Sequence, residues 1–204
     1  MAIQLQIQVQ KIQSVTTNQI NMENDSLKLA TFGGGCFWCT EAIYQLTEGI
    51  TVVEAGYSGG HVDDPTYQQV CGKKTGHAEV IRIQYNSKVI SFKEILDILW
   101  ATHNPTTLNQ QGNDIGPQYR SVIFYHNEEQ KTIAEQSLKE TDASSMYSDP
   151  IVTTIDPLIN YFKAENYHQN YYNDNREKNS YCTYVVKPKV EKYKKQFKDK
   201  LKKD

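Results

Sequence analysis

Cys36 and Cys39 form the group in this chain that is best suited to nucleophilic chemistry. They enclose Phe37 and Trp38, and three glycines at 33–35 precede them. The Cys-x-x-Cys spacing occurs in dithiol redox sites and in metal sites, and two aromatic rings beside a thiol suit an apolar substrate pocket. The sequence therefore favours a reactive thiol at Cys36, with a pair of small buried core residues as the alternative.

The elements on either side of this segment place Cys36 at the start of a helix. Residues 27–32 have the composition of a short strand, and residues 40–46 can form a helix with Ile43 and Leu46 on one face. Glycines permit a sharp turn between the two. Because the free N–H groups of a first helical turn favour a thiolate, we expect a low pKa for the Cys36 thiol.

Strand-like and helix-like segments alternate along the rest of the chain. Ser91 and Glu94 have the spacing of a capping box at a helix start. Strands are expected at 51–57, 77–85, 120–125 and 151–155, and helices at 91–103 and 127–141. Long loops are expected at 58–65, 104–117 and 172–182. Loops of this length often carry function, and the whole pattern predicts a mixed α/β layout with helices packed on a sheet.

Composition restricts the class of protein. With 204 residues, of which 38% are hydrophobic, the chain can form one domain with extensions. Four cysteines are too few for a disulfide-stapled secreted scaffold of this length, and the N-terminus lacks the pattern of a secretory signal. No stretch approaches the roughly 20 apolar residues of a membrane span. We therefore expect a soluble, cytoplasmic protein without a membrane partner.

The two ends of the chain differ from its middle. Residues 1–26 begin with alternating apolar and polar residues and continue with polar ones, which predicts a peripheral or disordered extension. Residues 187–204 contain nine lysines and three acidic residues, a balance that could bind nucleic acid or anionic lipid. Apolar residues recur there at three- and four-residue intervals: Val190, Tyr193, Phe197 and Leu201. This spacing favours an amphipathic helix packed on the domain, and we expect no nucleic-acid partner.

Glu79 is a candidate proton donor. In a strand, its side chain would share a face with His77 and Ile81. An acid in apolar surroundings has a raised pKa and can donate a proton near neutral pH. Periodicity alone favours a glutamate that faces solvent, and it does not distinguish Tyr67 and Tyr119 from the other tyrosines.

Six motifs occur along the chain in a characteristic order. They are Gly-Gly-Gly-Cys-Phe-Trp-Cys-Thr-Glu (33–41), Gly-Tyr-Ser-Gly-Gly (56–60), the segment 67–79 that ends in Thr-Gly-His-Ala-Glu, Asn-Pro (104–105), the segment 111–121 that begins with Gln-Gly-Asn-Asp, and Ala-Glu-Asn-Tyr-His-Gln (164–169). Together they resemble peptide methionine sulfoxide reductase of the A type across residues 27–182. The resemblance implies a two-layer α/β sandwich with a mixed sheet, a ferredoxin-like core and long active-site loops. It also implies a reductase domain at 27–186, between the extension at 1–26 and the basic helix at 187–204.

This resemblance implies reduction of the S epimer of methionine sulfoxide, free or in proteins, and hence repair of oxidised proteins. In such enzymes the cysteine at the position of Cys36 attacks the sulfoxide sulfur as a thiolate. The acid at the position of Glu79 gives a proton to the sulfoxide oxygen. Tyr67 and Tyr119 resemble a pair of hydroxyls that hydrogen-bond this oxygen as its charge develops.

The same resemblance implies roles for three further residues. Phe37 and Trp38 would hold the S-methyl group of the substrate in an apolar pocket. Asp114 matches a family position that helps to organise the site, by fixing backbone donors or water. No cofactor and no metal are implied.

A second thiol is expected to complete the reaction. After methionine leaves, Cys36 would be a sulfenic acid, which condenses with another thiol. Cys182 resembles the family's C-terminal resolving cysteine and follows a polar segment at 173–180. Cys39 is an alternative, although a bond within one helical turn would strain the helix, and direct reduction by an external thiol is another. A thioredoxin-like protein would reduce a Cys36–Cys182 disulfide, and we expect a monomer.

Two other classes of protein stay open on the residues alone. A general dithiol oxidoreductase would use Cys36 and Cys39 and would not need Glu79. A zinc-binding module would need two further ligands from Cys71, Cys182 or the histidines, and the chain lacks the second Cys-x-x-Cys pair of a zinc ribbon. Mutation of Glu79 and metal analysis distinguish these classes from the reductase.

Overall fold

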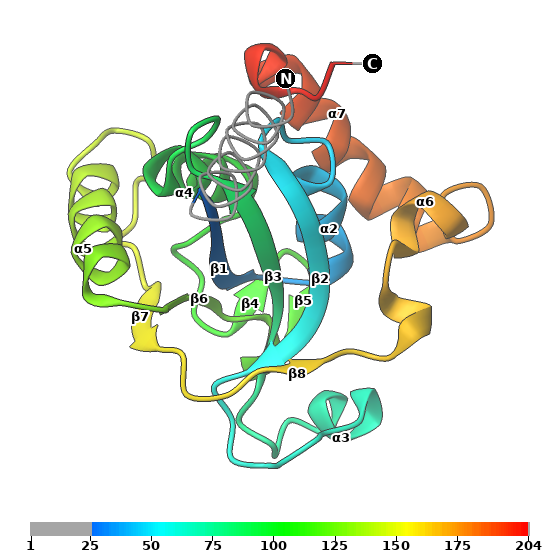
Figure 1. Ribbon diagram of the computed structural model, residues 1–204. Coiled ribbons are helices and arrows are strands. Elements are labelled where there is room, and N and C mark those ends of the chain that lie inside the picture. The colour runs from blue at the N-terminus through cyan, green and yellow to red at the C-terminus, as the bar shows by residue number, and fades with distance from the viewer. Residues whose placement is uncertain (1–25, 204) are drawn as a thin grey trace, which may run out of the picture.

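A mixed six-stranded sheet forms the centre of the protein. The computed structural model describes residues 26–203, so the extension expected at 1–26 lies outside the described residues apart from Ser26. The strands are ordered β7-β6-β1-β3-β2-β8 (Figure 1). β6 and β7 pair in parallel, and the other neighbouring pairs are antiparallel. These strands span Leu27–Gly34 (β1), Ile50–Ser58 (β2), Ala78–Asn86 (β3), Ser121–Tyr125 (β6), Thr154–Pro157 (β7) and Phe162–Lys163 (β8).

The central part of the fold follows the order βαββαβ. It comprises β1, α2 (Phe37–Tyr44), β2, β3, α4 (Phe92–Thr102) and β6, with the strand order β6-β1-β3-β2. This is the ferredoxin-like arrangement, so the expected α+β fold with a mixed sheet is confirmed. Further helices cover this core: α5 (Glu128–Asp142) packs against α4, and α7 (Lys187–Gln196) lies beside α2 (Figure 1).

The expected capping box defines the start of α4. The Ser91 hydroxyl accepts a hydrogen bond from the Glu94 N–H, and the Glu94 carboxylate accepts one from the Ser91 N–H. The apolar stripe of the helix is buried and comprises Phe92, Ile95, Leu96, Leu99 and Trp100. Because burial of each large apolar side chain contributes roughly 1.5–3 kcal/mol, this stripe holds α4 against the sheet more firmly than the cap does.

The side chains of β3 alternate between two apolar clusters on opposite faces of the sheet. Ile81 and Ile83 belong to the main core, which also includes α2 and α4. Val80 belongs to a smaller cluster with Val122 and Phe124. Glu79 lies two residues before Ile81 and therefore faces the main core, as the alternation predicts.

Two expected segments differ from the structure in their details. The strand expected at 151–155 pairs only from residue 154 onward, because the Ile151 N–H is donated to the Asp142 carboxylate and the Val152 N–H to the Pro105 carbonyl. Two of the expected loops contain short elements: the β4–β5 hairpin (Gln110–Gln111 and Asp114–Ile115), and α6 (Tyr171–Asn175).

The basic C-terminal segment packs on the core through its apolar stripe. Val190 and Tyr193 are buried, while Phe197 and Leu201 are partly buried against the main core. The lysines of α7 lie on its outer side, and Lys187, Lys192, Lys194 and Lys195 are exposed. In the described part of the chain, no helix is long and apolar enough to cross a membrane.

Candidate active site

Cys36 lies at the junction between β1 and α2. It is the N-cap residue of α2, as the sequence predicts, and its side chain is buried. The chain turns at Gly35, where φ is +96° and a Cβ atom would lie 2.5 Å from the side chain of Gln111. Gly33 allows close approach of β1 to β3, since a Cβ atom there would lie 2.7 Å from the Glu79 carbonyl oxygen. Gly33 and Gly35 therefore allow β1 to pack closely on β3 and to turn directly into Cys36.

The expectation of a low pKa for the Cys36 thiol is wrong for the free protein. Burial raises the pKa of Cys36 well above its ordinary value, and the nearby Cys39 and Glu79 raise it further. A hydrogen bond from Cys36 lowers the pKa of Cys39. Loss of solvation is therefore the main effect on the Cys36 thiol in the free protein.

Glu79 is a buried acid that is bonded directly to the start of α2. Only 1% of its surface is exposed, and Oε2 accepts a hydrogen bond from the Phe37 N–H at 3.1 Å. Burial raises its pKa to about 8, and the charges of Asp114 and Cys39 act in the same direction. The alternative of a glutamate that faces solvent is therefore wrong. Near neutral pH, Glu79 is therefore protonated, and it contacts the backbone of Phe37, the residue that follows Cys36.

Tyr67 and Tyr119 come from separate connections and share the site with Glu79. Tyr67 is the first residue of α3 (Tyr67–Cys71), and Tyr119 ends a 3-10 turn at Pro117–Tyr119. Both side chains are partly buried. Burial raises the pKa of each phenol, and the charge of Glu79 is the next contribution in both cases. Both hydroxyls therefore stay protonated and can donate hydrogen bonds.

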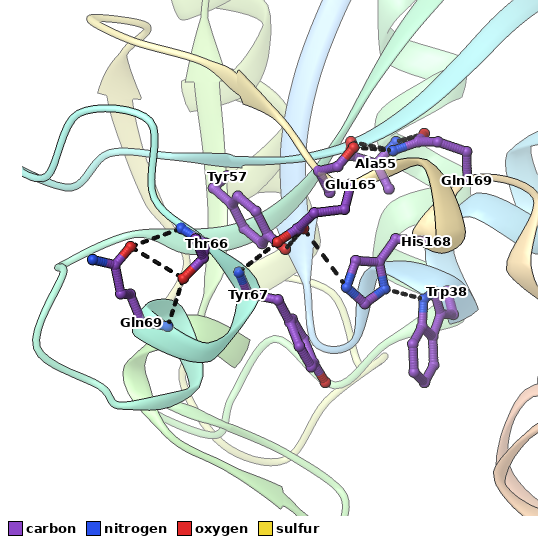
Figure 2. A network of polar contacts seen from close by, with 10 residues as sticks. Trp38, Ala55, Tyr57, Thr66, Tyr67, Gln69, Glu165, His168 and Gln169 are labelled. Atoms are coloured by element: carbon purple, nitrogen blue, oxygen red, sulfur yellow. Dashed lines mark hydrogen bonds and ion pairs between the residues drawn. The ribbon is translucent and has the colours of Figure 1, made fainter.

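Aromatic rings surround Trp38. Its indole stacks on Tyr171 with ring centroids 3.7 Å apart and an interplanar angle of 7°, and Tyr181 meets it edge-on at 5.9 Å. Phe37 lies 6.1 Å from the indole centroid and is buried. On its polar edge, the indole Nε1–H is donated to Nδ1 of His168 at 3.2 Å (Figure 2).

Asp114 contacts a tyrosine that the sequence did not single out. Its Oδ2 accepts a hydrogen bond from the Tyr181 hydroxyl at 2.6 Å. Tyr181 in turn interacts with the thiols of Cys36 and Cys39. Tyr171 and Tyr181 belong to this candidate site but were not predicted from the sequence, although Tyr181 directly precedes Cys182.

Cys182 differs from its expected setting at the end of a flexible segment. It begins a π-helical turn at Cys182–Val186 that continues into α7, and it is fully buried. All four cysteines are free thiols. Burial raises the pKa of Cys182, and the charge of Cys39 adds to this effect. Cys39 therefore interacts with both Cys36 and Cys182.

The other proposed cysteine ligands do not gather into a metal site. Cys71 is partly buried at the end of α3, where its thiol interacts with the Tyr67 hydroxyl. Across residues 26–203, no group of three or more His, Cys, Asp or Glu side chains is placed to hold a metal ion.

Comparison with known proteins gives consistent matches. A family model described as peptide methionine sulfoxide reductase matches residues 28–201. A protein of Leptospira borgpetersenii serovar Hardjo-bovis named peptide methionine sulfoxide reductase MsrA is 54% identical over 167 residues, which cover 82% of this chain and 93% of that protein. A protein of the same name from Saccharolobus solfataricus is 51% identical over 176 residues, or 86% of this chain and 98% of that protein.

Solved structures resemble the fold as well. The reduced form of Mxr1 from Saccharomyces cerevisiae has a TM-score of 0.67 and 36% sequence identity, and the match covers 76% of this chain and 90% of that one. Methionine sulfoxide reductase A of Corynebacterium diphtheriae has a TM-score of 0.65 and 30% identity, with coverage of 74% and 76%.

Proposed function

Because the chain belongs to the peptide methionine sulfoxide reductase family, as one of its A-type members, we propose that Cys36 is the nucleophile and Glu79 the acid of this reductase. The observation that carries the proposal is the 3.1 Å hydrogen bond between Glu79 and the Phe37 N–H. This bond holds a protonated, buried acid beside the helix start that bears Cys36. A general dithiol oxidoreductase has no sulfoxide oxygen to protonate and would not need this acid.

The reaction balances with the groups present. Attack by Cys36 on the sulfoxide sulfur is accompanied by transfer of the Glu79 proton to the sulfoxide oxygen, which would otherwise leave as oxide. The attack forms a bond between Sγ of Cys36 and the methionine sulfur, which then carries the hydroxyl group. As this hydroxyl group moves to Sγ, the bond between the two sulfurs breaks and its electron pair stays on methionine. Methionine departs, Cys36 is left as a sulfenic acid, and the proton released by the thiol restores Glu79. No net proton is consumed. A thiol with a raised pKa in the free protein is therefore compatible with the reaction, because its proton is lost only as the sulfur attacks.

Two tyrosines and an aromatic pocket support this chemistry. We infer that the hydroxyls of Tyr67 and Tyr119 donate to the sulfoxide oxygen, where charge builds up before the proton arrives. Phe37 and Trp38 would receive the S-methyl group. With the methyl group in the pocket and the oxygen on the tyrosines, one epimer presents its sulfur to Cys36, and we propose that this is the S epimer, in free methionine or in a protein.

The sulfenic acid requires a second thiol. We propose that Cys182 attacks it, which forms a Cys36–Cys182 disulfide and releases water. Cys182 is supported by its place in the family resemblance, while Cys39 is supported by its contact with Cys36. Since Cys182 is buried in a helical turn, its reaction requires the segment that follows α6 to move. A thioredoxin-like protein would then reduce the disulfide by thiol exchange.

Three cysteine variants test these assignments. Reduced Cys36→Ser, Cys39→Ser and Cys182→Ser proteins are each mixed with methionine S-sulfoxide in the absence of reductant, and the disulfides are mapped by mass spectrometry. We expect no methionine from Cys36→Ser and a Cys36–Cys182 link in the wild type and in Cys39→Ser. A Cys36–Cys39 link in the wild type would overturn the role of Cys182, and methionine from Cys36→Ser would overturn the nucleophile.

A further inference from the structure

His168 is a buried imidazole enclosed by aromatic rings. Its exposed surface is 1%, and its ring centroid lies 4.1–5.6 Å from four aromatic rings, those of Phe37, Trp38, Tyr67 and Tyr167. It comes from a connection about 130 positions away from Trp38 in sequence, and no step of the mechanism above uses it.

The contact with Trp38 determines which nitrogen of His168 carries the proton. An indole N–H can only donate, so Nδ1 of His168, at 3.2 Å, must be the unprotonated acceptor. In the neutral imidazole the proton is then on Nε2. That atom is buried without a hydrogen-bond partner and lies 3.8 Å from Oε2 of Glu165. Burial lowers the pKa of His168, although the Glu165 charge opposes this, and the neutral form is favoured.

Glu165 connects His168 to the start of α3. Its Oε1 accepts a hydrogen bond from the Tyr67 N–H at 2.8 Å, and its Oε2 accepts one from the Tyr57 hydroxyl at 2.9 Å (Figure 2). These two bonds fix the carboxylate, so that its negative charge faces the Nε2–H of His168. Figure 2 shows the resulting network of contacts, which runs from Tyr67 and Tyr57 through Glu165 and His168 to Trp38.

Stacking alone would let the indole slide across the Tyr171 ring as its χ1 angle changes. The parallel contact with Tyr171 restrains the tilt of Trp38, but it contains no hydrogen bond that would fix the position of the indole along the ring face. The hydrogen bond to His168 is the directional contact of this side chain. The Trp38 ring is only partly buried, so packing does not enclose it completely.

We propose that His168, oriented by Glu165, is a positioning residue that holds the Trp38 indole as a rigid wall of the substrate pocket and so sets which alkyl group on the sulfoxide the enzyme accepts. The identity of the substrate in this inference rests on the proposed function. The position of the indole rests on the contacts of Trp38 with His168 and Tyr171. The imidazole touches neither the reacting sulfur nor the oxygen in this account; it acts through Trp38.

Two substitutions separate the hydrogen bond from the volume of the side chain. In His168→Asn the side-chain oxygen occupies roughly the place of Nδ1 and can still accept from the indole, whereas His168→Leu retains apolar bulk and no acceptor. For methionine sulfoxide we expect His168→Leu to raise KM about tenfold with a smaller change in kcat, the size that one lost hydrogen bond predicts. His168→Asn should keep most of the wild-type KM.

Selectivity gives the second readout. The ratio of kcat/KM for methionine sulfoxide to that for its S-ethyl homologue should fall in His168→Leu and be retained in His168→Asn, because only a fixed wall excludes the larger group. In a Trp38→Phe background, where no indole N–H exists, His168→Leu should have little further effect. An unchanged selectivity ratio in His168→Leu, or an equal effect in the Trp38→Phe background, would overturn the proposal.

A measurement without substrate distinguishes failure of this proposal from failure of the proposed function. The protein has two tryptophans, so 5-fluorotryptophan labelling gives two fluorine NMR signals, and the Trp38→Phe variant assigns them. We expect His168→Leu to shift or broaden the Trp38 signal, His168→Asn to do so less, and the Trp100 signal to report an intact core in both. An unmoved Trp38 signal in His168→Leu would refute the positioning of the indole. If the Trp38 signal moves in His168→Leu but the wild-type protein does not reduce methionine sulfoxide, the positioning of the indole stands and the proposed function is refuted.

Discussion

Replacement of Glu79 by glutamine removes the proton that we propose for the reaction and keeps the hydrogen bond to Phe37. The amide oxygen of Glu79→Gln can still accept the Phe37 N–H, so the start of α2 keeps its contact. The amide cannot supply a proton to the sulfoxide oxygen. A positioned general acid contributes about 10²–10⁴-fold to a rate, and we expect the single-turnover rate to fall by that factor.

Although it slows the reaction, Glu79→Gln should stabilise the folded protein, by an amount that depends on pH. Burial raises the pKa of Glu79 from 4.5 to about 8, and this difference corresponds to about 5 kcal/mol. The pKa of Glu79 is higher in the folded protein than in the unfolded one. The contribution of this acid to the stability of the wild type is therefore fully present below pH 4.5. It is lost as the pH rises through 8. Glu79→Gln has no charge to bury, so it should gain stability relative to the wild type across this window.

Urea unfolding at pH 5, 7 and 9 measures this gain, and a second glutamate provides the control. Although burial opposes it, hydrogen bonds from Lys163 and Tyr161 hold the pKa of Glu54 below its ordinary value. Glu54→Gln should therefore lose stability relative to the wild type at neutral pH, and less of it in acid. If Glu79→Gln reduces sulfoxide within threefold of the wild-type rate, Glu79 is not the proton donor. If the stability difference stays constant from pH 5 to pH 9, the pKa of Glu79 is not raised in the folded protein.

Three further substitutions test the supporting contacts. Tyr181→Phe breaks the 2.6 Å bond to Asp114 and should lower Tm by about 5 °C in calorimetry, since a hydrogen bond to a charged group contributes about 2 kcal/mol. Glu41→Gln should gain stability relative to the wild type as the pH rises from 5 to 8 in urea titrations, because burial raises the pKa of this acid to about 7 and the amide carries no charge. Gly35→Ala should destabilise the protein by about 2–4 kcal/mol in urea unfolding, because φ is +96° there and a Cβ atom would lie 2.5 Å from Gln111; a loss under 0.5 kcal/mol would mean that the turn relaxes freely.

Features set by neighbouring residues were predictable from the sequence. The capping box at Ser91 and Glu94 and the apolar stripe after it define α4 within a residue of the expected bounds. The glycines before Cys36 and the apolar residues after it placed the thiol at a helix start. Alternation in β3 correctly put Glu79 on the face of Ile81. Each of these features depends on contacts within a few positions of the chain.

Features that depend on distant segments were not predictable in this way. The raised pKa of Cys36 results from burial by parts of the chain that lie far from it in sequence, and no local signal reports that loss of water. The bond between Trp38 and His168 spans 130 positions. Cys182 is buried because its segment continues as a helix into α7, whereas its polar residues alone indicated a flexible loop. The proposed catalytic residues were suggested by the resemblance of whole motifs and not by the local pattern.

A single-turnover experiment measures whether Cys36 reduces a methionine sulfoxide with its own electrons. Fully reduced protein is incubated with excess methionine S-sulfoxide without a reductant, and the methionine formed is compared with the amount of protein. We predict at least one methionine for each chain, together with loss of the free Cys36 thiol, and none from the R epimer. No methionine from the S epimer, or an equal yield from Cys36→Ser, would show that Cys36 is not the reducing thiol.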